Sequence, residues 1–180
     1  MSDVIHMTAP DGRGFTFKEW CEYVGSGKDL EPYRTADGSI FNVEGFTFNA
    51  HGYCLNPHTI KIAEPDGRTY VEVRTYRRYA NKDNTLPVWY YSLFSINCDA
   101  HGFGAMVPSA TEKQAVITAL RQAIKSIKNK IEWLEHVIEA EKASGFDARH
   151  STYPACLEHN RRMEQLVLQE LDKQLQLELF

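Results

Sequence analysis

The fold is decided by the stretch SATEKQAVITALRQAIKSIKNKIEWLEHVIEAEKASG at residues 109–145. Its apolar residues recur at alternating intervals of three and four, the repeat that keeps two helices facing each other along a seam. These seam residues are Ile117, Leu120, Ile124, Ile127, Ile131, Leu134 and Ile138. The spacing predicts a long helix that begins with a capping box between Ser109 and Glu112 and ends at Ser144-Gly145.

A second helix is predicted after Tyr153-Pro154, where a further apolar stripe begins. The stripe consists of Met163, Leu166, Val167, Leu171 and Leu175. Two helices joined by a short connection form an antiparallel hairpin with a coiled-coil-like seam. Additional apolar residues widen the surface of the first helix beyond what one partner helix can cover. We expect the sheet or a second copy of the chain, in a two-fold symmetric homodimer, to cover Val116, Ala123, Trp133 and Val137.

The preceding 108 residues have the pattern of an antiparallel β-meander. Turn sequences that contain Asp-Gly occur at 10–13, 37–38 and 65–68, and the first and third also contain Pro. Aromatic and β-branched runs predict strands at 40–48, 58–63, 69–79 and 88–97. The last run, VWYYSLFSI, is apolar at both alternating positions, which predicts a central strand covered on both faces.

One short helix is predicted within the β-rich region. Thr16 and Glu19 are spaced as a capping box, and Gly25 follows as a residue that ends a helix. We therefore expect a helix over residues 17–24. The fold class is α+β, with a β-rich aromatic sheet region at 1–108 and a helical hairpin at 109–180 that together form one structural unit.

Composition limits the classes of function. The chain has 180 residues and a net charge of −4, so it is not drawn as a whole to nucleic acid or anionic lipid. No run of roughly 18 apolar residues is present and the first residues lack a secretion signal, which predicts a cytoplasmic protein without membrane contact. The four cysteines contain no CxxC pair, as expected of reduced thiols in a cytosol.

A candidate binding face lies in the run RTYRRYANK at residues 74–82. Alternation along a strand places Tyr70, Arg74, Tyr76 and Arg78 on one face, and Lys82 follows in the next turn. Interleaved guanidinium and aromatic groups can contact another protein, and they can also hold the phosphates and stack the bases of a single-stranded nucleic acid. We expect a protein partner, with single-stranded nucleic acid as the alternative.

Two loops carry residue types that could bind zinc or act as nucleophiles. His51 and Cys54 lie in HGYCLNPH, and Cys98 and His101 lie in NCDAHGFG. Thiolate and imidazole are ligands that zinc prefers, and a cysteine beside a base can be a nucleophile. The spacing matches no zinc-ribbon pattern and no cysteine-enzyme signature. We therefore expect no metal and no cofactor, and a zinc- or cysteine-dependent enzyme is kept as a second alternative.

The hypothesis that these observations favour is a non-catalytic protein-interaction module. An aromatic-rich sheet and a long helical hairpin both provide surfaces for protein partners. Small acidic proteins of this style are encoded by phages and mobile elements to bind and inhibit a host defence complex. The sequence does not identify the partner.

Overall fold

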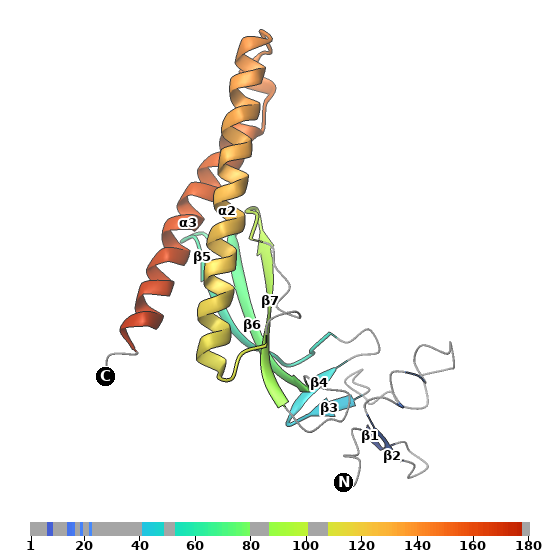
Figure 1. Cartoon of the computed structure of the whole chain (residues 1–180). Helices are drawn as coiled ribbons and strands as arrows, with labels where there is room; N and C mark the ends of the chain where they lie inside the picture. Colours follow the sequence, from blue (N-terminus) through green and yellow to red (C-terminus); the bar gives the residue numbers. More distant parts are fainter. Residues whose placement is uncertain are drawn as a thin grey trace. The chain divides into compact units, whose positions relative to one another are not determined.

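The chain has an α+β fold, as predicted (Figure 1). The computed structural model describes residues 7–8, 14–16, 19, 22, 41–48, 53–79, 87–100 and 108–177. The elements in chain order are β1 (Met7–Thr8), β2 (Gly14–Phe15), β3 (Phe41–Val43), β4 (Phe46–Phe48), β5 (His58–Ala63), β6 (Tyr70–Tyr79), β7 (Pro87–Ile96), α2 (Glu112–Ala143), the 3₁₀ helix η3 (Ala148–His150) and α3 (Tyr153–Gln176).

The chain divides into two compact units, which are described separately. The first unit comprises Met1–His58, Thr75–Tyr90 and Pro108–Glu112, and the second comprises Thr59–Arg74, Tyr91–Val107 and Lys113–Phe180. Strands β6 and β7 contribute residues to both units. The expectation that the regions 1–108 and 109–180 form one structural unit stays a prediction.

A three-stranded antiparallel sheet has the order β5-β6-β7. Its strands lie where the runs at 58–63, 69–79 and 88–97 predicted them, to within one residue. The turn between β5 and β6 has the predicted chemistry, since the Arg68 amide donates to Asp66 Oδ1 at 3.0 Å and Gly67 has a φ of 70°. A left-handed φ favours glycine, and the Gly67 amide donates to the Glu64 carbonyl at 2.8 Å.

The prediction of a central strand was wrong, because β6 and not β7 lies in the middle of the sheet. Along β6 the residues of one face, Val71, Val73 and Thr75, are buried. Along β7 only Tyr91 is buried, and Phe94 is 40% exposed. Strand β7 is apolar at both alternating positions because its outer face also carries aromatic side chains. On an edge strand such rings can pack against their neighbours without being buried.

The predicted single strand at 40–48 was also wrong, because this segment forms a hairpin of β3 and β4. The register pairs Asn42 with Thr47 and Val43 with Phe46. The two residues between the strands, Glu44 and Gly45, have φ values of 48° and 91°. Two consecutive positive φ values are typical of a tight hairpin turn, in which glycine at the second position relieves strain.

The first hairpin and the short helix are described in part. Strand β1 pairs with β2 in antiparallel register, Thr8 opposite Gly14, and the predicted turn at 10–13 between them lies outside the described residues. The predicted capping box is confirmed, since the Thr16 amide donates to Glu19 Oε2 at 2.8 Å and the Glu19 amide donates to Thr16 Oγ1 at 3.2 Å. Glu19 and Glu22 are helical; the rest of the predicted helix at 17–24 and the turn at 37–38 lie outside the described residues.

Helices α2 and α3 pack against each other as the predicted hairpin. The connection ends α2 as expected, with a φ of 73° at Gly145 and a hydrogen bond of 3.1 Å from the Phe146 amide to the Glu141 carbonyl. The helices cover one face of the sheet in the second unit (Figure 1). None of the described helices is long and apolar enough to cross a membrane.

The predicted start of the first helix was wrong. Helix α2 begins at Glu112, and Ser109 pairs its main chain with Trp89 through two hydrogen bonds of 2.9 Å. Glu112 Oε1 accepts hydrogen bonds from Thr75 Oγ1 at 2.8 Å and lies 2.6 Å from His58 Nδ1. Ser109 therefore acts as a strand-pairing residue, and the Glu112 side chain bonds to residues of β5 and β6 within the first unit.

Candidate functional site

The outer face of the sheet in the second unit carries a cluster of cationic, aromatic and aliphatic side chains. Side chains alternate along each strand, so the residues opposite to the buried Ile62, Val71, Val73 and Tyr91 point away from the core. The outward residues with large side chains are Lys61, Tyr70, Arg74, Phe94 and Ile96, which we call the outer patch.

The outer patch is held together by ring and cation contacts. Lys61 Nζ lies 4.0 Å from the centre of the Tyr70 ring, and the Arg74 guanidinium carbon lies 4.9 Å from the centre of the Phe94 ring. The Tyr70 and Phe94 rings are 6.2 Å apart. Glu72 pairs with Arg74 at 2.5 Å. The carboxylate holds the edge of the guanidinium and the Phe94 ring packs on its face, so the orientation of the guanidinium is fixed.

Three residues of the outer patch, Lys61, Phe94 and Ile96, were missed by the sequence interpretation. Phe94 is 40% exposed and Ile96 is 37% exposed. Both lie in the run that was predicted to be buried on two faces. Their alternation with Tyr91 and Leu93, which contact the core, is the feature of the sequence that could have identified them.

The other predicted partner-binding residues belong to the first unit or lie outside the described residues. The Tyr76 ring stacks on Tyr90 at 6.5 Å and meets the edge of Phe48 at 5.7 Å. The Arg78 guanidinium lies 5.6 Å from the centre of the Phe48 ring. Burial raises the pKa of Tyr76, so this hydroxyl stays neutral at physiological pH. Lys82 lies outside the described residues.

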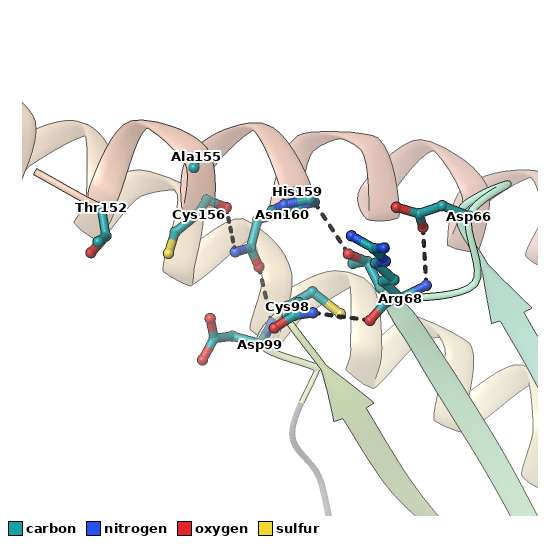
Figure 2. Close-up of a pocket in the computed structure, with 11 residues that line it drawn as sticks. Asp66, Arg68, Cys98, Asp99, Thr152, Ala155, Cys156, His159 and Asn160 are labelled. Atoms are coloured by element: carbon teal, nitrogen blue, oxygen red, sulfur yellow. Dashed lines mark hydrogen bonds between the residues drawn. The ribbon is translucent and has the colours of Figure 1, made fainter. Parts of the chain in front are cut away.

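A cavity of about 600 Å³ lies between the sheet and α3 in the second unit (Figure 2). The turn after β5 contributes Asp66 and Arg68, the end of β7 contributes Cys98 and Asp99, and α3 contributes residues such as His159. The three segments are cross-linked by hydrogen bonds from Asn97 Nδ2 to the Arg68 carbonyl, 3.0 Å, and from the Asp99 amide to Asn160 Oδ1, 3.1 Å.

A buried carboxylate lies beside this cavity. Glu64 accepts a hydrogen bond from Arg162, and its Oε2 lies 3.0 Å from His159 Nδ1, which is 3.2 Å from Thr69 Oγ1. Burial alone would raise the pKa of Glu64, but the hydrogen bonds from Arg162, Thr69 and His159 outweigh it and the pKa is lowered. The ionised carboxylate thus anchors α3 to the turn after β5.

The thiols in the described part of the predicted Cys/His loops are poor nucleophiles. Burial, with the nearby charges of Asp99 and Glu64, raises the pKa of Cys98 to about 12. Burial also raises the pKa of Cys54. Because the thiolate is the reactive form, both side chains are neutral and weakly reactive near pH 7.

Of the four predicted metal-ligating residues, the structure describes only Cys54 and Cys98. Cys54 lies in the first unit and Cys98 in the second, and His51 and His101 lie outside the described residues. Among the residues that the structure describes, no three His, Cys, Asp or Glu side chains form a cluster suited to a metal ion. The absence of metal and cofactor stays a prediction.

Comparison with known proteins gives no family assignment. No family model, no curated protein and no solved structure matches this chain.

Proposed function

We propose that this chain is a non-catalytic protein-interaction module that binds its partner through the outer patch. The observation that carries the proposal is the composition of the outer patch, in which the exposed Phe94 contacts both Arg74 and Tyr70 on the face of the sheet that points away from the core. Aromatic residues and arginine dominate the binding energy at protein interfaces, especially where they form a cluster.

Preorganisation supports the same proposal. The Arg74 side chain is held by Glu72 and by the Phe94 ring before any partner binds. A side chain that is already ordered loses less conformational entropy when it enters an interface. The outer patch can therefore bind a partner with little rearrangement.

Single-stranded nucleic acid is a weaker candidate for this face. Its aromatic rings could stack on bases, and Lys61 and Arg74 could contact phosphates. However, the carboxylate of Glu72 lies 2.5 Å from Arg74 and lowers the positive potential that would attract a phosphate chain. Binding of a protein partner does not require that potential. The role that we propose for this chain is that of a phage or mobile-element protein that inhibits a host defence complex.

The test is a comparison of two double variants in affinity purification from cells that naturally contain the chain, before and after nuclease treatment. Phe94→Ala with Arg74→Ala removes the centre of the outer patch. Phe146→Ala with Arg149→Ala removes an exposed aromatic residue and an exposed arginine near η3. We expect a nuclease-resistant protein partner to bind the wild type and the second variant and to be lost from the first.

The result is decisive if both variants have the melting temperature of the wild type. Substitutions at exposed positions usually leave the melting temperature nearly unchanged. Retention of the partner by the Phe94 and Arg74 variant would contradict the proposed surface. Loss of the bound material from the wild type after nuclease treatment would instead identify the nucleic-acid alternative.

A further inference from the structure

The main chain of β5 presents a row of hydrogen-bonding groups at the edge of the sheet in the second unit. Strand β5 is a terminal strand, since the order of the sheet is β5-β6-β7. The Glu64 amide, directly after β5, donates to the Thr69 carbonyl at 2.9 Å, so this N–H points toward β6. Main-chain groups alternate between the two edges of a strand, so those of Thr59, Lys61 and Ala63 point away from β6.

These edge groups are unpaired in the part of the chain that the structure describes. None of the described residues bonds to the main-chain N–H or C=O that Thr59, Lys61 and Ala63 direct away from β6. Thr59 and Lys61 are exposed and Ala63 is half-buried, so solvent reaches this edge. An open edge is a template for one further strand, whose main chain supplies the missing donors and acceptors.

The side chains of β5 set the pattern that an added strand must match. Ile62 is buried in the core and Ile60 packs against it, so the alternating Thr59, Lys61 and Ala63 lie on the opposite face, which is the face of the outer patch. The side chains of an added strand would alternate in the same way, some beside Lys61 and the others beside Ile60. A matching strand therefore alternates polar and aliphatic residues.

Lys61 determines the charge of the matching strand. Its ammonium lies 4.0 Å from the centre of the Tyr70 ring and makes no ion pair among the described residues. Arg74, the other cation of the outer patch, is already paired with Glu72. A carboxylate directly opposite Lys61 would therefore meet an ammonium that is available for pairing.

The same lysine opposes the pairing of β5 with β5 of a second copy. In a two-fold antiparallel pair that uses all three edge residues, Thr59 lies opposite Ala63 of the other copy and Lys61 lies opposite its own counterpart. Like charges directly opposite each other are destabilising, and lysine on an edge strand hinders such self-pairing. The segment that fits this edge is therefore a different one, and it is acidic.

We propose that the protein partner of this chain adds an extended acidic strand to the free edge of β5, with a glutamate or aspartate opposite Lys61 and aliphatic residues beside Ile60. This inference rests on the proposed function, because it gives the form in which the partner reaches the outer patch. Lys61 belongs both to the outer patch and to this edge, so one partner contacts both. The main-chain bonds supply affinity and the alternating side chains supply specificity.

The direct test is an NMR titration of the full chain with the capped peptide Thr-Val-Glu-Val-Thr, observing the main-chain amides. The peptide reads the same in both directions, so its glutamate can lie opposite Lys61 in either orientation. We expect saturable shifts of the Thr59, Lys61 and Ala63 amides. The peptide with lysine in place of glutamate should bind about fivefold more weakly, and the peptide with an N-methylated glutamate, which lacks one edge donor, about tenfold more weakly.

A proline at the edge tests the main-chain bonds from the side of the protein. Ala63→Pro removes an N–H that points away from β6, so the bonds within the sheet are retained and the strand should still form. The variant should bind the peptide about tenfold more weakly, while the amide resonances of α2 and α3 stay as in the wild type. Lys61→Gln should reduce the difference between the glutamate and lysine peptides to less than about twofold, and this result decides the charge preference even if the proline variant fails to fold.

The outcomes separate this inference from the proposed function. The absence of saturable shifts at millimolar peptide, or equal affinity of the N-methylated peptide, would overturn strand addition, and equal affinity of the lysine peptide would overturn the acidic segment. A cellular partner that is lost from the Phe94 and Arg74 variant but retained by folded Ala63→Pro would leave the outer patch as the binding surface and remove the added strand. The expected peptide results, together with a partner retained by the Phe94 and Arg74 variant but lost from Ala63→Pro, would support the edge and remove the centre of the outer patch.

Discussion

The two halves of the α2 seam differ in burial although their sequence repeat is the same. In the half near the start of α2, the residues Ile117, Leu120, Ile124 and Ile127 are buried in a core that includes Ile62, Val71, Val73 and Tyr91 of the sheet. In the half near the connection, Leu134 is buried, but Ile131 and Ile138 are only half-buried and the neighbouring Trp133 is 47% exposed. This second half extends beyond the strands of the sheet (Figure 1).

The difference shows what a seam pattern predicts and what it does not. A repeat of three and four predicts which residues face the partner helix. A seam residue such as Leu134 is buried without belonging to the core shared with the sheet, but two helices alone leave the flanks of the seam in contact with solvent, so burial of every seam residue requires a third surface. The sheet provides that surface for Val116 and Ala123, which are buried, but not for Trp133 and Val137.

The largest expected effect comes from truncating one seam residue in each half. Ile127→Ala should lower the free energy of unfolding by about 2–5 kcal/mol, from lost transfer free energy and the cavity left in a closed core. Ile138→Ala removes the same atoms from a half-buried position and should cost about 1 kcal/mol. Chemical denaturation of both variants measures the contrast, and equal costs would show that the sheet adds nothing to burial of the seam.

The next effect concerns Glu64, which connects the sheet to α3 next to the exposed half of the hairpin. Its pKa is lowered in the folded chain by hydrogen bonds from Arg162, Thr69 and His159, although burial acts in the opposite direction. A carboxylate with a lowered pKa stabilises the fold fully above its unfolded pKa of about 4.3. That stabilisation is lost as the pH falls through the folded pKa.

Glu64→Gln should therefore destabilise the chain near pH 7 by an amount on the order of 1 kcal/mol, since Arg162 is half exposed and its pairing is screened. Below the folded pKa of Glu64 the wild type and the variant should approach the same stability. Thermal unfolding from pH 7 to pH 3 measures this convergence. Glu158→Gln, which removes an exposed partner of Arg162 at 3.5 Å, is the matched control and should have little effect at any pH.

Most of the fold was predictable because its elements depend on local patterns. The strands of the sheet, the turn at 65–68, the hairpin and its Gly145 end follow from side-chain spacing and from residues that favour particular φ values. The errors arose where tertiary pairing decides. Ser109 has the sequence of a helix cap, but its main chain pairs with Trp89.

The candidate sites were less predictable than the fold. Tyr70 and Arg74 could be placed on one strand face from alternation, but Phe94 and Ile96 join them only through the order of strands in the sheet. The environment of Arg77, whose Nη atoms bond to Glu44 and to the Pro87 carbonyl while its buried Nε has no partner in the described part of the chain, is a property of packing. No spacing in the sequence reports that property.

Self-association should depend on the exposed half of the hairpin. We propose that the homodimer expected from the sequence is formed through Trp133, which packs edge to face on Tyr153 at 5.7 Å and lies 4.3 Å from Lys130 Nζ. Trp133→Ala should shift the chain toward the 20.6 kDa monomer while changing monomer stability by less than about 1 kcal/mol. Sedimentation equilibrium at tens of micromolar measures the shift, and a monomeric wild type would contradict the dimer.

The smallest effects on the free energy of unfolding are expected for residues of α2 outside the seam. At such positions the half near the start of α2 and the half near the connection should behave alike. Lys128 lies 3.7 Å from Glu164, but its side chain is 57% exposed and the pair is screened by solvent. Lys125 is also exposed. Replacing either residue by alanine should change the free energy of unfolding by no more than about 0.5 kcal/mol, since alanine also favours the helix. Chemical denaturation measures the free energy of unfolding of each lysine variant, and the loss in Ile127→Ala provides the scale for comparison. If Lys128→Ala lowered the free energy of unfolding by more than about 1 kcal/mol, the surface of α2 around Lys128 would have to be covered in solution. The surface by which the hairpin binds a partner would then lie on the side of Lys128 and not on the side of Trp133.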